Sequence, residues 1–191
     1  MKNIGLSSVM IAVVLGVAFA GWTATFTVTP TSDNDCSDLN CNLQSALNAA
    51  AANNEDDTIN MGDGTFSGPF TYVTTKNFSL TLNGSESSVI DGKNESQGML
   101  LTTSGSDGTN AHITLRNISF QNGNSQSYVG GGGLHASTTK SSITIEKCTF
   151  SNNTGQDGGG AYVESISGTI TVRDNVFRVN SAVNLSGGGA E

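Results

Sequence analysis

The fold is indicated by three stretches of the second half of the chain: ITLRNISF (residues 113–120), ITIEKCTF (143–150) and ITVRDNVF (170–177). They align without gaps, at intervals of 30 and 27 residues. In each stretch apolar and polar residues alternate, two polar residues interrupt the pattern, and alternation resumes up to a closing phenylalanine. Alternation with a period of two is typical of half-buried strands. Each stretch therefore predicts two short strands separated by a bend.

A glycine run leads into a third short strand of each repeat. The runs are at 130–133 before Leu134, at 158–160 before Ala161 and at 187–189 before Ala190. Three strands and three turns in 27 to 30 residues describe one coil of a β-helix. Antiparallel hairpins fit poorly, because the tight Asn-Gly turn that would reverse the chain is missing from the expected places.

Stacked coils, spaced by about 4.8 Å, bring equivalent residues of successive repeats into ladders. The expected core ladders are Ile113, Ile143 and Ile170; Leu115, Ile145 and Val172; and Phe120, Phe150 and Phe177. In the same alignment Cys148 falls on the inside, between Ile118 and Asn175, which favours a buried and unreactive thiol. Less regular coils precede these repeats, so we expect four or five coils in an all-β, right-handed parallel β-helix.

The end of the solenoid near the N-terminus has a candidate cover. Asn42 can cap a short helix over about Leu43 to Ala52, in which Leu43, Leu47 and Ala50 share one face. We therefore expect a signal peptide at 1–20, an N-terminal cap with this capping helix at 21–57, and β-helix coils at 58–191.

The first residues are typical of a secretory signal peptide. Lys2 precedes an apolar stretch at 9–20 that ends in the small-x-small sequence Ala-Phe-Ala. A retained N-terminal anchor is the alternative. An exported chain meets an oxidising compartment, so Cys36 and Cys41 are candidates for a local disulfide. Zinc is the competing interpretation of this pair, but no second Cys or His pair follows at ligand spacing.

The charge of the chain argues against nucleic acid as a partner. The formal net charge is −8, and loss of Lys2 with the signal peptide makes it −9. Lysine and arginine are scattered singly, so the sequence offers no basic surface for phosphate backbones. No segment after the signal peptide is long and apolar enough to predict insertion into a membrane.

Two parts of the sequence resemble known bacterial surface proteins. Residues 41–50, CNLQSALNAA, are similar to the N-terminal cap of surface β-helix proteins, which often read Cys-x-Leu-Arg-Glu-Ala-Ile; here Gln44 and Ser45 replace Arg-Glu. The second half resembles the repeats of chlamydial-type polymorphic outer membrane proteins, with Phe-x-x-Asn at Phe150 and Phe177 and Gly-Gly-Ala at 159–161 and 188–190. The first copy departs from both motifs. The resemblance spans residues 36–191.

This resemblance implies a pectin-lyase-like β-helix that serves as a surface passenger domain in adhesion. It further implies a secreted, outer-membrane-associated location and a protein or glycan of a host or neighbouring cell as the partner. Such domains are attached through a C-terminal barrel or sorting domain, and the sequence stops at Glu191 within a repeat. We therefore expect the anchor in a C-terminal region that is missing here.

A polysaccharide lyase or hydrolase is the main alternative, since the same architecture hosts such enzymes. The chemistry needs a carboxylate cluster with a basic residue nearby. The candidates in the repeats are Asp157, Asp174, Arg116 and Arg173. The two arginines share a repeat position with Glu146 between them, which favours a solvated turn of alternating charge. We therefore expect no catalytic residue and no cofactor.

A calcium loop is suggested by Asp33 and the acidic residues after it, but the pattern fails. Position six, which needs glycine, is Asp38, and position twelve, which needs glutamate, is Gln44. We expect no metal site.

One set of outward residues is a candidate ligand-binding face. His135, Tyr162 and Glu191 occupy the same position in the strand that follows each glycine run. Aromatic and polar side chains in one row form a surface on which a glycan or a protein could rest. Ordinary exposed residues are the alternative.

Overall fold

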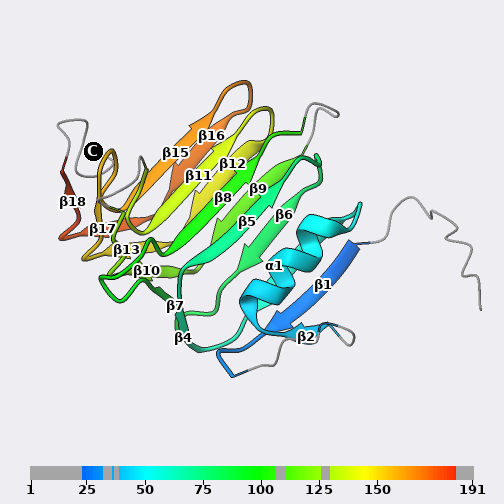
Figure 1. Cartoon of the computed structure of the whole chain (residues 1–191), viewed down its shortest axis with the longest axis horizontal. Coiled ribbons are helices and arrows are strands. Elements are labelled where there is room, and N and C mark those ends of the chain that lie inside the picture. The colour runs from blue at the N-terminus through cyan, green and yellow to red at the C-terminus, as the bar shows by residue number, and fades with distance from the viewer. Residues whose placement is uncertain (1–22, 32–35, 37–38, 106–110, 126–129, 184–191) are drawn as a thin grey trace, which may run out of the picture.

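The computed structural model describes residues 23–31, 36, 39–105, 111–125 and 130–183. The expected signal peptide at 1–20, the acidic segment after Asp33 and the position of Glu191 lie outside the described residues. Within them, parallel strands wind into a β-solenoid of about five turns, with a short helix near the N-terminus (Figure 1). The all-β parallel solenoid predicted from the repeats is confirmed.

The described strands form three long parallel sheets and one short pair, named here sheets A to D. Sheet A contains, in spatial order, β16 (Ile170–Arg173), β12 (Ser142–Glu146), β9 (His112–Arg116), β6 (Leu80–Asn83), β3 (Asp56–Met61), β1 (Thr23–Val28) and β2 (Asn40–Cys41). Sheet B contains β17 (Val176–Arg178), β13 (Thr149–Ser151), β10 (Ser119–Gln121), β7 (Ser88–Asp91) and β4 (Gly64–Ser67).

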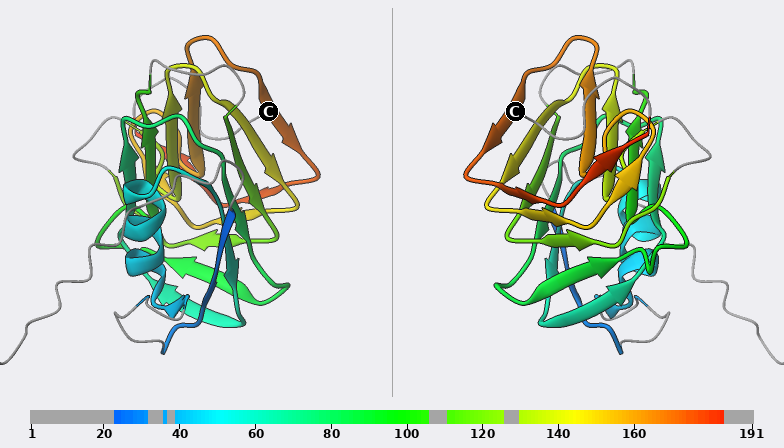
Figure 2. Two further views of the ribbon diagram at one scale, coloured as in Figure 1. Left: turned by 90° about the vertical axis from the view of Figure 1, so that its right-hand side faces the viewer. Right: turned by 90° about the vertical axis from the view of Figure 1, so that its left-hand side faces the viewer.

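Sheet C contains β15 (Ala161–Ser165), β11 (Leu134–Thr138), β8 (Met99–Thr103) and β5 (Phe70–Thr74). Sheet D pairs β14 (Thr154–Gly155) with β18 (Ser181–Ala182). Each complete coil contributes one strand to sheet A, then one to B, then one to C. Figure 2 shows the three sheets as the sides of a triangular cross-section. The strands of each sheet come from successive coils. The side chains that lie next to a residue on the outer surface of a sheet therefore belong to the coils before and after it.

The expected ladders form the core. Ile143 pairs with Ile113 and with Ile170, and Phe150 pairs with Phe120 and with Phe177. The phenylalanine rings stack, with centroids 5.0 Å apart for Phe120 and Phe150 and 4.9 Å for Phe150 and Phe177. Since repeats with the same pattern stack in register, each apolar position of one coil covers the same position of the next.

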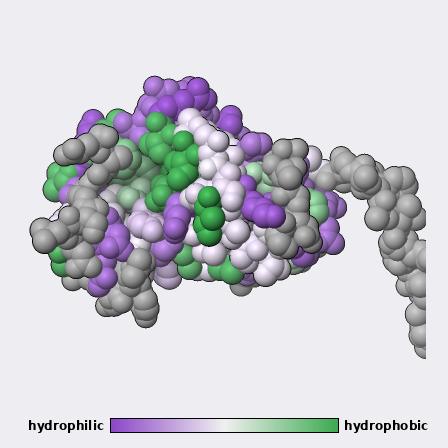
Figure 3. Space-filling model, turned by 90° about the horizontal axis from the view of Figure 1, so that it is seen from above, coloured by the Kyte–Doolittle hydropathy of each residue, from purple (hydrophilic) through white to green (hydrophobic). Residues whose placement is uncertain are grey.

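Apolar side chains that stay exposed are concentrated in the last described coil. They include Ile166, Ile170, Val172, Val176, Val179 and Val183. Within the described residues no further strand pairs with β16 or β17, so the inward ladder positions of this coil remain partly open to solvent. Figure 3 shows the molecule from above, where apolar side chains gather in a patch.

Asparagine at the turns explains the Phe-x-x-Asn motif. Asn153 is fully buried, donates from Nδ2 to the Phe120 carbonyl at 3.0 Å, and accepts at Oδ1 from the Gly123 amide at 2.7 Å. Asn180 repeats the contact one coil later by donating to the Phe150 carbonyl at 3.0 Å. An amide group can satisfy both a donor and an acceptor of the bent backbone, which a buried corner requires.

The N-terminal segment contributes more to the solenoid than the sequence indicated. Residues 23–28 were expected in the cap, yet they form β1, which pairs in parallel register with β3 from Thr23 and Asp56 to Val28 and Met61. No repeat motif marks this strand. Its alternation of threonine with apolar residues places Phe26 and Val28 in the core.

The capping helix is α1 (Leu43–Ala52), with the expected N-cap. The Asn42 side chain accepts from the Ser45 amide at 2.9 Å, and the buried face consists of Leu43, Ala46, Leu47 and Ala50. The helix packs beside β5 (Figure 1). Because it lies at the edge where sheet C begins, α1 takes the place of a sheet C strand.

Side chains close the edge between α1 and sheet C. Gln44 donates from Nε2 to the Thr71 carbonyl at 2.8 Å and accepts at Oε1 from the Thr71 amide at 2.9 Å. Lys76 donates to the carbonyls of Ala52 and Asn53 at the end of the helix. The Gln44 amide thus pairs with the edge strand β5 as another strand would. This pairing protects β5 from the addition of a strand from another chain.

The cysteines divide into a bonded pair and a buried thiol. Cys36 and Cys41 form a disulfide of S–S length 2.08 Å. Cys148 is buried on the inside of the coil, and desolvation raises the pKa of its thiol to about 11. At neutral pH this thiol is protonated, which makes it a poor nucleophile.

Candidate functional site

The candidate ligand face is the outward surface of sheet C, and the glycine runs determine where it lies. Backbones approach closely at these runs: a Cβ on Gly132 would lie 2.4 Å from the Thr154 carbonyl oxygen. After the two described runs, at 130–133 and 158–160, the chain enters the sheet C strands β11 and β15, and the first apolar residue points inward, as Leu134 does in β11. The next residue therefore points outward, which is how His135 and Tyr162 reach the surface.

His135 and Tyr162 are brought together by the strand register. They are paired residues of β11 and β15, and their ring centroids lie 5.1 Å apart with planes inclined at 57°. This tilted arrangement is one that aromatic pairs favour. Gly130 has a φ of 131°, and a Cβ there would lie 2.2 Å from His135 Nδ1. The imidazole is thus packed against the Gly130 backbone as well as the tyrosine ring.

One carboxylate contacts the aromatic pair, and the charge of a second one acts on it. The Tyr162 hydroxyl donates to Glu164 Oε2 at 3.3 Å, and Glu164 is the next outward residue of β15. Burial, followed by the negative charges of Glu164 and Asp157, raises the pKa of Tyr162 above its ordinary value. Asp157 precedes the glycine run that enters β15, so its negative charge acts on the tyrosine from that turn.

The remaining outward residues of sheet C are uncharged. The row through the aromatic pair is Thr71, Leu100, His135 and Tyr162, and the row beside it is Val73, Thr102, Ser137 and Glu164. Leu100 is half-buried and Val73 is 56% exposed. The outward face therefore combines an apolar and aromatic row with the Glu164 carboxylate at the β15 end.

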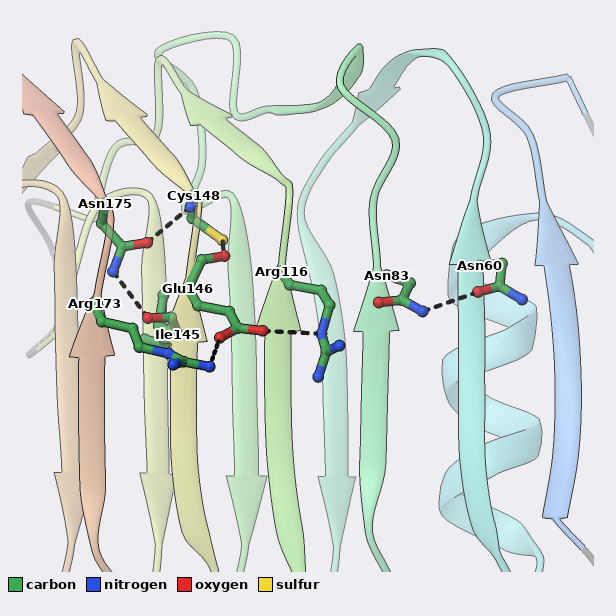
Figure 4. Close-up of polar contacts among 8 residues, drawn as sticks. All are labelled: Asn60, Asn83, Arg116, Ile145, Glu146, Cys148, Arg173 and Asn175. Atoms are coloured by element: carbon green, nitrogen blue, oxygen red, sulfur yellow. Dashed lines mark hydrogen bonds and ion pairs between the residues drawn. The ribbon is translucent and has the colours of Figure 1, made fainter.

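Sheet A carries the arginines that were considered for catalysis. Arg173 Nη2 forms an ion pair with Glu146 Oε2, and Arg116 Nε lies 3.4 Å from Glu146 Oε1 (Figure 4). The Arg116 contact is an ion pair without hydrogen-bond geometry. The expected alternation of charge is confirmed, since Glu146 pairs with Arg116 on one side and Arg173 on the other. The expected solvated turn is wrong for Glu146, which ends strand β12 and is only 8% exposed between the two arginine side chains.

The carboxylates considered for catalysis lie at different corners of the coil. Asp157 lies in the segment between β14 and β15, whereas Asp174 occupies the left-handed turn between β16 and β17. Among the described residues no group of three or more His, Cys, Asp or Glu side chains is placed to hold a metal ion.

Glu164 and Leu100 belong to the face but were not identified from the sequence. Glu164 could have been found, because it follows Tyr162 by two residues on a strand and therefore shares its side of the sheet. Leu100 lies in a coil without the recurring motif, so its register with His135 could not be read from an alignment of repeats.

Comparisons with known proteins leave the family open. No family model, no curated protein and no solved structure matches this chain. No helix in the described part of the chain has the length and apolar character that crossing a membrane requires.

Proposed function

We propose that this chain is an exported surface-recognition module, a β-helix passenger domain that adheres to proteins or glycans of a host or neighbouring cell. The observation that carries the proposal is the in-register His135 and Tyr162 pair on the outward face of sheet C. Partly exposed aromatic side chains are enriched where proteins recognise partners, because they offer a large contact area at a low entropic cost.

The size of the face supports weak contact by many copies. Four strands spaced by about 4.8 Å and five residues long, at about 3.3 Å each, give a face of roughly 15 by 17 Å. This is about 250 Å², well below the roughly 800 Å² that each partner buries in a standard interface. A single module therefore binds weakly, and display of several modules on one surface raises the overall strength.

The lyase or hydrolase alternative gains no support from the positions of its candidate residues. Arg116 and Arg173 are engaged with Glu146 on sheet A, while Asp157 and Asp174 lie at separate corners. Preorganised charge at one point is what such a transition state needs.

A matched pair of variants tests the proposal. Beads coated densely with the purified chain are incubated with cells, and bound cells are counted. His135→Ala/Tyr162→Ala is compared with His112→Ala/Thr144→Ala, which removes outward side chains from sheet A instead. We expect the sheet C variant to lose most adhesion and the sheet A variant to retain it. Equal adhesion by the two variants contradicts the proposal.

A further inference from the structure

The charges of sheet C are of one sign. None of its eight outward strand positions is lysine or arginine: Thr71, Val73, Leu100, Thr102, His135, Ser137, Tyr162 and Glu164. The Tyr162 hydroxyl donates to the carboxylate of Glu164, and the negative charge of Asp157 also acts on the tyrosine. The whole chain is acidic as well, with 16 Asp and Glu against 8 Lys and Arg. The face therefore presents a negative end within a negative molecule.

The uncharged part of the face suits an aliphatic chain. Leu100 pairs with His135, which pairs with Tyr162, so one row runs from an aliphatic side chain to an aromatic ring across three strands. Val73 is exposed in the neighbouring row. Lysine and arginine side chains lay their methylene stems along apolar surface while the charged group reaches a polar one.

We propose that this face binds a basic peptide segment of a partner protein, with a lysine or arginine group over the Tyr162 ring near Glu164 and its stem along His135 toward Leu100. This rests on the proposed function and names the partner's chemistry. The tyrosine ring attracts a cation over its face, and the two carboxylates add attraction of the same sign. An acidic glycan or a nucleic acid is repelled by the same carboxylates.

A neutral glycan fits the face less well than a basic peptide does. A sugar ring can rest on Tyr162, but it gains nothing from the charge of Glu164 and Asp157. A cation uses the ring and the Glu164 carboxylate together and is also attracted by the charge of Asp157, so the contact of Tyr162 with Glu164 favours the cationic partner.

The probe is a fluorescein-labelled peptide of eight residues in which lysine alternates with threonine, and binding to the full chain is followed by fluorescence anisotropy. The matched peptide has glutamine in place of lysine. We expect the lysine peptide to bind more tightly and to weaken as salt is added, since screening acts on exposed charges. Equal binding of the two peptides overturns the inference.

Variants assign the binding to the face. Tyr162→Phe keeps the ring and should keep most affinity, whereas Tyr162→Ala should weaken binding about two- to fivefold, the range of one exposed cation–π contact. Glu164→Gln and Asp157→Asn should each weaken it, while Glu86→Gln, which removes an equal charge from the exposed turn before β7, should not. Equal loss in Glu164→Gln and Glu86→Gln overturns the inference, because net charge alone would then explain binding.

The outcome separates this inference from the proposed function. If the chain adheres to cells through sheet C but does not bind the lysine peptide more tightly than the glutamine peptide, the inference is contradicted and the proposed function is not. Preference for neutral β-linked glucose oligomers over the peptide also contradicts it. A chain in which the sheet A variant loses as much adhesion as the sheet C variant contradicts the proposed function itself. Unchanged far-ultraviolet circular dichroism in each variant shows that losses arise at the face.

Discussion

Replacing Phe150 by alanine should uncouple the last coils of the solenoid. Phe150 is fully buried and stacks on Phe120 and Phe177, with planes inclined at 4° and 9°. Truncating a buried phenylalanine to alanine costs about 3–5 kcal/mol. The two stacked pairs add about 1–3 kcal/mol. The expected loss of at least about 4 kcal/mol is a large part of the roughly 5–15 kcal/mol by which a domain is stable.

The free energy of unfolding is measured by urea denaturation followed by far-ultraviolet circular dichroism. Phe150→Leu keeps an apolar side chain but loses the ring stack, so it should cost about 1–3 kcal/mol. Thr144→Ala changes an outward residue of the same coil and should stay within about 0.5 kcal/mol. Because each coil contacts only its neighbours, Phe150→Ala should also unfold in two steps, with the N-terminal coils melting last. A cost below about 1 kcal/mol for Phe150→Ala would refute the stacked register.

Three further predictions concern the thiol, the buried carboxyl and the cap. Cys148 should react with a thiol reagent only after unfolding, since burial raises its pKa to about 11; rapid labelling of the native chain would contradict this. Burial raises the pKa of Asp57 from 3.8 to about 6, although a hydrogen bond from Asn53 opposes the shift. The folded state therefore holds this proton more tightly, so stability falls as pH rises from about 4 to about 6. Asp57→Asn should reduce this loss of stability, measured as the fall in melting temperature between about pH 4 and about pH 6. An unchanged fall would mean that another group causes it. Gln44→Ala removes both hydrogen bonds to Thr71 and should cost about 1–3 kcal/mol by urea denaturation, whereas a loss below about 0.5 kcal/mol would show that the amide pairing is unimportant.

The repeats made the core predictable, while the edges of the fold were not. Ile113, Ile143 and Ile170 occupy one position of a repeated pattern, and identical patterns stack in register, so their ladder follows from the sequence. β1 has no such counterpart, because its alternation TATFTV pairs with a strand of different sequence, and only the tertiary pairing reveals it.

The candidate face was partly predictable for a similar reason. The shared repeat position of His135 and Tyr162 predicts that they are neighbours, but the 5.1 Å ring contact also depends on Gly130 leaving room for the imidazole. The charge of Asp157 acts on Tyr162 from a turn, where the alternation of a strand gives no guide to the direction of a side chain. The burial of Glu146 likewise depends on how two flexible arginine side chains fold over it, which a repeat position does not specify.

Site-specific photo-crosslinking tests most directly whether recognition occurs through sheet C. A photoreactive phenylalanine analogue replaces Ser137, an outward residue of sheet C, or Thr144, an outward residue of sheet A. Each chain is illuminated on the surface of the cells to which it adheres, and crosslinked products are identified by mass spectrometry. We expect a partner protein to be crosslinked from position 137 and little or none from position 144. Crosslinking from position 144 alone would contradict it.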